Sequence, residues 1–149
     1  MNPWLHIIGI GEDGWAGLGA PARAALQSAE VIVGGDRHHA LAPELAAKRI
    51  RWPSPFRAMV DEIGALNDKT VAILVTGDPL WYSAGGLMAA RFPAAELAFY
   101  PQLSAFQWGA ARMRWSLADV ETLTVHGRPA EQAIPWFAEG ARLLLLTQD

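Results

Sequence analysis

The chain has 149 residues, of which 52% are hydrophobic and 18% are charged, with a formal net charge of −3 and no cysteine. This composition excludes general disorder, and the lack of cysteine excludes a thiolate nucleophile, an iron–sulfur cluster and any cysteine-based zinc site. The slightly acidic balance argues against a nucleic-acid partner, because general nucleic-acid binders are usually basic. We find neither a signal-peptide pattern nor a run of about 18 apolar residues, so we expect a cytoplasmic protein without a membrane partner.

Short apolar runs alternate with helical patterns in the first half of the chain. Pro21 suits the first turn of one helix, and Asp36 suits the N-terminus of another. The run at 70–76 is continuous and apolar, which is typical of a strand buried on both faces. The strands predicted in this half are 4–10, 31–33, 49–52 and 70–76, and the predicted helices are 21–29, 36–41 and 56–67.

The alternation continues in the second half, with strands predicted at 96–100, 121–125 and 142–147 and helices at 83–91, 103–113 and 131–138. This order predicts an α/β fold with a mostly parallel sheet. The least patterned stretch, 115–120, separates an expected N-terminal α/β domain at 1–115 from a second unit at 120–149. Two strands and one helix cannot cover both faces of a parallel pair, so we expect the second unit to be the start of a truncated C-terminal α/β domain.

The residues from Gly9 to Gly14 read G-x-G-x-x-G directly after the first predicted strand, an order found in dinucleotide-binding folds. In that motif the third glycine opens a helix that faces the pyrophosphate, whereas here the helical pattern begins only at Pro21. Glu12 and Asp13 would also repel a pyrophosphate. Three interpretations stay open: an NAD-type site, an irregular loop without a ligand, and a loop that approaches another ligand or a substrate.

The predicted strand at 70–76 runs directly into Gly77, Asp78 and Pro79. Open parallel sheets bind ligands at the carboxyl ends of their strands, so this turn is a candidate ligand site. Glycine lets a ligand approach the backbone, proline stiffens the turn, and the Asp78 carboxylate can bind hydroxyl groups or face a cation. An ordinary Asp-Pro turn explains the same three residues equally well.

Four segments stand in an order and spacing that together carry a family resemblance: IGIG (8–11), VGGDRH (33–38), VTGDPLWY (75–82) and PQLSAF (101–106). They resemble the tetrapyrrole methylases of cobalamin biosynthesis. The segments EDGW (12–15) and VHGRP (125–129) are similar to those of the members that methylate ring carbon C5 of a precorrin. The resemblance covers nearly the whole chain and implies a C-methyltransferase that uses S-adenosylmethionine, releases S-adenosylhomocysteine, takes a precorrin as substrate and forms a homodimer.

The resemblance also implies which residues bind the cofactor. It assigns this contact to the turn at Gly77, Asp78 and Pro79 and to the helix start at Ser104 and Ala105. One departure from the family pattern lies close by, because Gln102 stands where members usually carry a glycine. A side chain is therefore expected where the backbone would approach the cofactor.

The resemblance sets the glycine loop, with Gly9 and Gly11, beside the substrate. A precorrin carries several carboxylates, so the cationic and imidazole side chains of the loops are candidate anchors, with solvated loop charge as the simpler explanation. These candidates are Arg37, His38, His39, His126 and Arg128. Asp13 is the candidate catalytic group, as a proton acceptor or an orienting residue, and no metal site is expected because adjacent histidines point apart.

Methyl transfer from a sulfonium to a ring carbon is a direct displacement that needs no nucleophilic side chain. Orientation of the two reactants can supply about 7–11 kcal/mol of the barrier reduction, so the missing cysteine is no objection. Two other functions are compatible with the same sheet, namely an NAD-type nucleotide-binding domain and a non-catalytic α/β interaction domain.

Overall fold

The computed structural model describes residues 3–52 and 58–147, which form two compact units divided between Gln102 and Leu103. Helix α6, which the sequence pattern assigned to the first domain, belongs to the second unit by its contacts. Within the described residues no helix is long and apolar enough to cross a membrane. The strands of the first unit are β1 (Leu5–Ile10), β2 (Val31–Gly34), β3 (Lys48–Arg51), β4 (Val71–Thr76) and β5 (Leu97–Tyr100).

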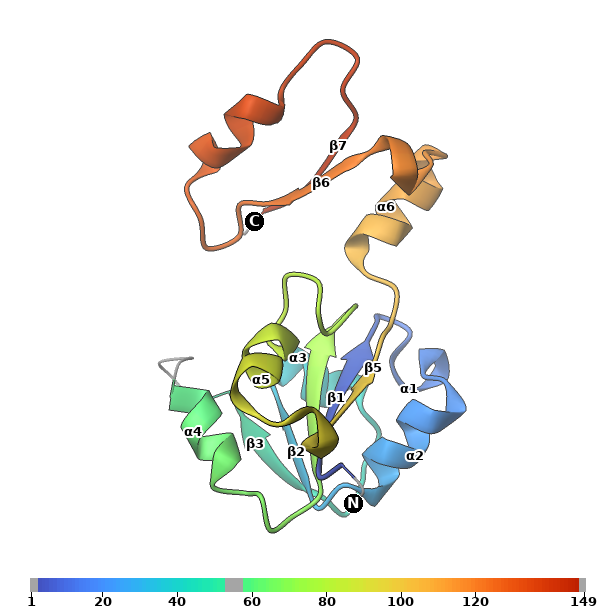
Figure 1. Ribbon diagram of the computed structural model, residues 1–149. Helices are drawn as coiled ribbons and strands as arrows, with labels where there is room; N and C mark the ends of the chain where they lie inside the picture. Colours follow the sequence, from blue (N-terminus) through green and yellow to red (C-terminus); the bar gives the residue numbers. More distant parts are fainter. Residues whose placement is uncertain (1–2, 53–57, 148–149) are drawn as a thin grey trace. The chain divides into compact units, whose positions relative to one another are not determined.

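The first unit is built on one five-stranded sheet with the order β3-β2-β4-β1-β5 (Figure 1). Every neighbouring pair in this sheet is parallel, and Leu5 of β1 lies opposite Val71 of β4. The central strands are buried on both faces because their sequences are almost entirely aliphatic. The predicted α/β class with a mostly parallel sheet is confirmed.

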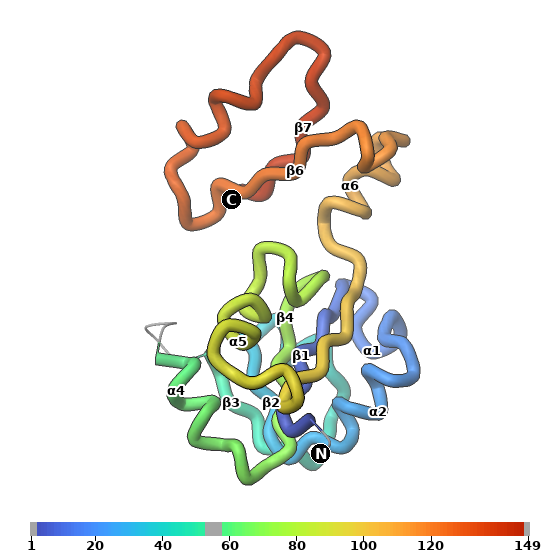
Figure 2. The backbone as a smooth tube through the Cα atoms, in the orientation of Figure 1, coloured from blue at the N-terminus to red at the C-terminus, as the bar shows by residue number. Residues whose placement is uncertain are grey.

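Helices cover both faces of this sheet. Helices α4 (Met59–Gly64) and α5 (Gly85–Arg91) lie on one side, and α1 (Gly14–Gly17) and α2 (Ala20–Ser28) lie on the other (Figures 1 and 2). Met59, Ile63 and Met88 pack with the odd-numbered positions of β1 and β4, whereas Leu26 packs with the even-numbered ones. Burial of each such aliphatic side chain contributes about 1.5–3 kcal/mol, so the alternation of faces determines the register.

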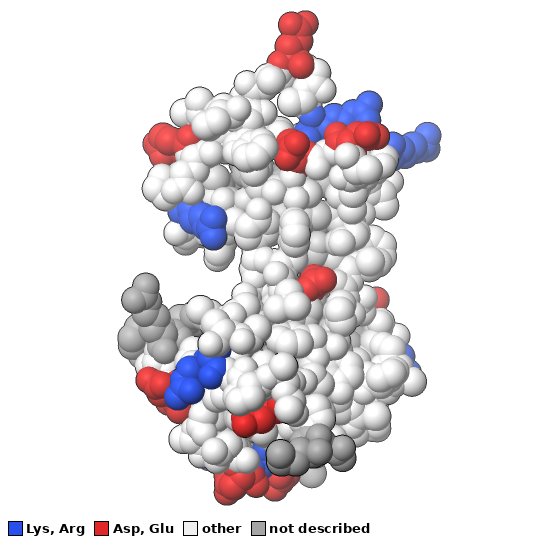
Figure 3. Space-filling view, in the orientation of Figure 1, with Lys and Arg blue, Asp and Glu red and all other residues white. Residues whose placement is uncertain are grey.

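The second unit contains helix α6 (Ala105–Met113), the 3-10 helices η3 (Leu117–Asp119) and η4 (Ala130–Trp136), and a parallel pair of strands, β6 (Glu121–Thr124) and β7 (Leu143–Leu146). Helix α6 packs against β7, because Gly109 leaves room for the Leu144 side chain. The strands are only partly buried, and several large apolar side chains are exposed. Charged groups are sparse on the surface shown in Figure 3, in agreement with the 18% charged residues.

Most predicted elements agree with the structure to within two residues at each end, and three predictions differ by more than that or in the type of element. The residues after Gly14, expected to be irregular, form the single helical turn α1, which ends where the Leu18 backbone turns to an extended conformation. The segment expected as a helix at 131–138 is the 3-10 helix η4, since Pro135 lacks the N–H that a continuing α-helix needs. Helix α4 ends at Gly64 rather than at 67, and the predicted start of this helix at 56 lies outside the described residues.

Candidate functional site

The candidate site of the first unit lies at the carboxyl edge of the five-stranded sheet. Since all five strands are parallel, the segments that follow β1, β2, β4 and β5 leave the sheet at this same edge. These segments carry most of the candidate residues, namely the glycine loop after β1, the start of α3 (Asp36–Leu41) after β2, and Gly77, Asp78 and Pro79 after β4.

The backbones of Gly9, Gly77 and Gln102 approach one another so closely at this edge that a side chain on Gly9 would not fit. A methyl group on Gly9 would overlap the carbonyl oxygen of Gly77 and would lie 2.9 Å from the Cβ atom of Gln102. The Gly77 amide donates to the Ile10 carbonyl at 3.4 Å, which continues the pairing of β1 and β4 beyond the last strand residue. Three chain segments that are far apart in sequence therefore pack backbone against backbone at the site.

The turn after β4 is held in one conformation by its own residues. Gly77 has a φ of +68°, a conformation that favours glycine, and it is buried. The Asp78 carboxylate accepts a hydrogen bond from the Leu80 backbone N–H through Oδ1 at 2.8 Å, which fixes the turn from inside. Pro79 is buried, and its carbonyl lies so close to Gly85 that α5 can begin only with a glycine there.

The glycine loop is folded onto itself and tied to the segment after β5. The Asp13 carboxylate lies beside Gly11 and Gly17, at positions that a side chain on either glycine would occupy. The Gln102 amide donates to the Gly17 carbonyl at 2.7 Å. Gln102, the residue that departs from the family pattern, therefore holds the end of α1, which follows the glycine loop, through its own side chain.

A hydrogen-bonded network joins the segments after β1 and β2 to the end of β4. The Arg37 guanidinium pairs with the Glu12 carboxylate through Nη2 and donates to the Thr76 hydroxyl oxygen through Nη1 at 3.2 Å. The His38 ring lies 2.9 Å from the same oxygen through Nε2, and its Nδ1 accepts from the Gly35 N–H at 3.1 Å. Arg37 and His38 are thus brought together, with Thr76 between them.

His38 and His39 have separate partners, as expected for adjacent histidines. The His39 Nε2 donates to the Ile50 carbonyl at 3.0 Å, a contact that holds α3 against β3. Burial lowers the pKa of His38, and the neighbouring charges of Arg37 and His39 lower it further. A neutral His38 ring is consistent with the hydrogen bonds, because Nδ1 must be unprotonated to accept from the backbone of Gly35.

We predict that the free energy of unfolding falls as the pH is lowered below about 6.5, the ordinary pKa of histidine. Burial lowers the pKa of His6 as well as that of His38, so the unfolded chain takes up protons at a higher pH than the folded chain. The stabilisation that the lowered pKa values of His6 and His38 provide is complete above pH 6.5 and is lost as the pH falls from 6.5 through the pKa values of the folded chain. Urea unfolding at a series of pH values measures this, and the H6Q/H38Q double variant should show a weaker dependence; an equal slope in both proteins would contradict the prediction.

The remaining candidate residues belong to the second unit. Ser104 caps α6, where its Oγ accepts from the Phe106 N–H at 3.3 Å and its own N–H donates to Gln107. Ala105 is the first residue of that helix and is exposed. His126 and Arg128 lie exposed in the turn after β6, in which the Arg128 N–H donates to the Val125 carbonyl at 3.1 Å.

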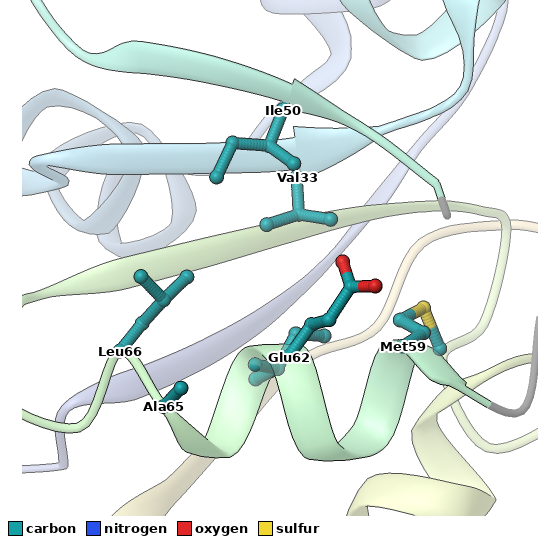
Figure 4. Close-up of a pocket in the computed structure, with 7 residues that line it drawn as sticks. Val33, Ile50, Met59, Glu62, Ala65 and Leu66 are labelled. Carbon is teal, nitrogen blue, oxygen red and sulfur yellow. The ribbon is translucent and has the colours of Figure 1, made fainter. Parts of the chain in front are cut away.

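An apolar pocket of about 260 Å³ lies apart from this edge network, between α4 and strands β2 and β3 (Figure 4). Glu62 is the only charged side chain among the described residues that line it. Among the described residues, no group of three or more histidine, aspartate or glutamate side chains is arranged to hold a metal ion.

Sequence reasoning missed Glu12 as the partner of Arg37 and missed Thr76 altogether. The available signal for Thr76 was its position as the last residue before Gly77 and the only polar residue in the run 71–76. Glu12 carried no comparable signal, because it gained its partner only when the segments after β1 and β2 met.

The sequence matches the family of tetrapyrrole (corrin/porphyrin) methylases over residues 4–148. The chain belongs to this family. The resemblance inferred from the four sequence segments is thereby confirmed. This tetrapyrrole methylase chain is 41% identical over 150 residues to the decarboxylating precorrin-6Y C(5,15)-methyltransferase of a Sinorhizobium species, with all of this chain and 36% of the relative covered.

A second curated relative and a solved structure are also similar to this tetrapyrrole methylase chain. It is 30% identical to the cobalt-precorrin-7 C(5)-methyltransferase of Salmonella typhimurium over 124 residues, which are 83% of this chain and 62% of the relative. The chain therefore spans less than two thirds of the length of these relatives. Its fold is similar to the crystal structure of a precorrin-6Y methylase from Archaeoglobus fulgidus, with a TM-score of 0.71 and 24% identity over 97% of this chain and 73% of that chain.

Proposed function

We propose that this chain is the methyl-transferring part of an S-adenosylmethionine-dependent C-methyltransferase that acts on ring carbon C5 of a precorrin. Family membership and the names of the precorrin-6Y and cobalt-precorrin-7 relatives support the reaction class and the substrate. The observation that carries the proposal in this chain is the backbone meeting of Gly9, Gly77 and Gln102 at the carboxyl edge, where parallel sheets bind ligands.

The turn at Gly77, Asp78 and Pro79 has a chemistry that fits the cofactor. When bound, S-adenosylmethionine supplies an electrophilic methyl group on a positively charged sulfur. Gly77 offers backbone without a side chain, and Asp78 keeps its second carboxylate oxygen available, since Oδ1 accepts from Leu80. A carboxylate oxygen is a suitable acceptor for an ammonium or a ribose hydroxyl group. Following the family resemblance, we include Ser104 and Ala105 in the same role.

For the substrate we propose contacts at Gly9 and Gly11 and anchoring of a carboxylate by Arg37. The sequence predicts His38 as a second anchor, but its Nδ1 accepts from Gly35 and its Nε2 contacts Thr76, so we propose that it supports Thr76 beside Arg37. From the family resemblance alone, His126 and Arg128 are proposed for the anchoring role. Arginine suits this role because its planar guanidinium binds carboxylates through two parallel hydrogen bonds. Asp13, whose carboxylate lies beside Gly11 and Gly17, is proposed as the residue that orients the substrate or accepts its proton.

Calorimetry with S-adenosylhomocysteine tests the cofactor site. We expect the wild-type chain to bind it and the D78N variant to bind about tenfold more weakly, because the variant keeps the turn-forming Oδ1 acceptor but loses a charge-assisted hydrogen bond. D68N is the matched control, since Asp68 is an exposed carboxylate just before β4, where the amino-terminal ends of the strands lie. Failure of the wild-type chain to bind at millimolar ligand, or binding of NAD instead, would contradict the proposed function.

We also propose a cytoplasmic homodimer, in line with the family resemblance. The second unit exposes several large apolar side chains, among them Trp136 and Phe137, and exposed apolar surface of this kind supports contact with another protein chain. Sedimentation equilibrium measures the oligomeric state, and a monomer at all concentrations would contradict this assembly.

A further inference from the structure

We propose that the Thr76 hydroxyl group is a fixed hydrogen-bond donor to an oxygen acceptor of the methyl-accepting substrate. The inference rests on the proposed function and adds a residue that neither the sequence motifs nor the family resemblance assigned. Thr76 is the last residue of β4, is exposed at the carboxyl edge, and lies directly before the Gly77 turn.

The direction of the Thr76 hydrogen follows from the groups around its oxygen. Arginine has only donors, so Arg37 Nη1 at 3.2 Å donates to the Thr76 oxygen. The Gly35 N–H can only donate, so His38 Nδ1 must be the acceptor in that contact and the ring hydrogen must lie on Nε2. His38 Nε2 therefore also donates to Thr76, at 2.9 Å.

Two donors use both lone pairs of the Thr76 oxygen. A hydroxyl oxygen has two acceptor positions and one hydrogen, so the hydrogen must point away from Arg37 and His38. Within residues 3–52 and 58–147 no group of the protein accepts it. The hydroxyl is thus held in one orientation and donates outward at the edge of the sheet, which lowers the entropic cost of binding an acceptor there.

The arrangement that holds the hydroxyl is itself firmly supported. Gly34 has no side chain, and a Cβ atom in its place would lie 3.1 Å from the His38 Cβ atom, so the glycine makes room for the imidazole. The Gly35 N–H then fixes the ring through Nδ1. On the other side, pairing with Glu12 holds the guanidinium of Arg37. His38 and Arg37 act here as positioning residues for Thr76.

The position of Thr76 favours the substrate over the cofactor as the acceptor. Its two donors, Arg37 and His38, both come from α3, which follows β2, so they reach Thr76 from the β2 side of β4. Arg37, which donates to Thr76 through Nη1, is also the proposed anchor of a substrate carboxylate, so an acceptor that reaches Thr76 belongs to the ligand that Arg37 holds.

The test compares T76V, which is close in shape but has no hydroxyl, with T76S, which restores it. In methyl-transfer assays on the full chain with the precorrin substrate, we expect T76V to raise KM about five- to tenfold, the effect of one net hydrogen bond, and T76S to stay within about twofold of wild type. T70V is the matched control, because Thr70 lies just before the opposite end of the same strand. Calorimetry should show unchanged affinity of T76V for S-adenosylhomocysteine.

Three results would overturn the inference: a wild-type KM for T76V, an equal increase for T76S and T76V, or a loss of S-adenosylhomocysteine affinity in T76V in place of a change in KM. Thermal melting shows whether each variant is folded, and the exposure of Thr76 makes large changes in stability unexpected. If the wild-type chain binds no S-adenosylhomocysteine and transfers no methyl group, the proposed function falls and this inference falls with it. Wild-type binding and turnover without an effect of T76V refute the inference alone.

Discussion

The G9A variant is expected to lose about 2–4 kcal/mol of its free energy of unfolding, together with the proposed affinity for S-adenosylhomocysteine. The added methyl group would overlap the Gly77 carbonyl oxygen and crowd the Cβ atom of Gln102 at 2.9 Å. Both neighbouring atoms belong to the backbone or are bonded directly to it, so they cannot rotate away. The overlap can be relieved only if β1 and the turn after β4 move apart. Urea unfolding measures the stability loss, and calorimetry measures the loss of binding.

G86A is the matched control for this prediction. Gly86 lies in α5, and a Cβ atom on it would meet nothing within 4 Å. Alanine in place of glycine within a helix is favourable by about 0.5–1 kcal/mol, so G86A should be as stable as wild type or slightly more so. If G9A and G86A have the same stability, the close approach of the three segments is not present in solution.

The strands were the most predictable part of the fold, and they were predictable for a physical reason. Continuous aliphatic runs such as 71–75 are favourable only where both faces are buried, which selects a parallel sheet with helices on both sides. Helix boundaries were less predictable because local signals compete. Pro135 changed the expected α-helix of the second unit into a 3-10 helix, and Gly14, with a φ of +54°, began a helical turn that its composition disfavours.

The candidate site was only partly predictable. The position of Gly77, Asp78 and Pro79 followed from the end of a recognisable strand, whereas the contacts of Thr76 depend on strand order. Strand β2 lies next to β4, although helix α4 and strand β3 separate them in sequence, and this order brings α3 to Thr76. The sequence pattern predicts that the Gln102 side chain lies where the backbone would approach the cofactor. In the structure it donates to the Gly17 carbonyl, a contact no local pattern contains.

The R37A variant is expected to raise the KM for the proposed precorrin substrate about tenfold or more, because it removes the proposed charge-assisted contact and one of the two donors to Thr76. Steady-state methyl-transfer kinetics measure this effect. R91A is the matched control, since it removes the same charge at the C-terminal end of α5, away from the carboxyl edge. If both variants raise KM equally, general charge rather than Arg37 attracts the substrate.

The E12Q variant separates an anchoring role of Arg37 from a structural one, because the two roles predict opposite results. If Arg37 binds a substrate carboxylate, Glu12 competes for the same guanidinium, and its neutralisation should lower KM about two- to fivefold, the range expected for an exposed ion pair. If Arg37 only holds the loops together, loss of the ion pair should raise KM as R37A does. The sign of the change in E12Q therefore decides whether the pair of Arg37 and Glu12 is a substrate site held by an internal carboxylate or a brace between two loops.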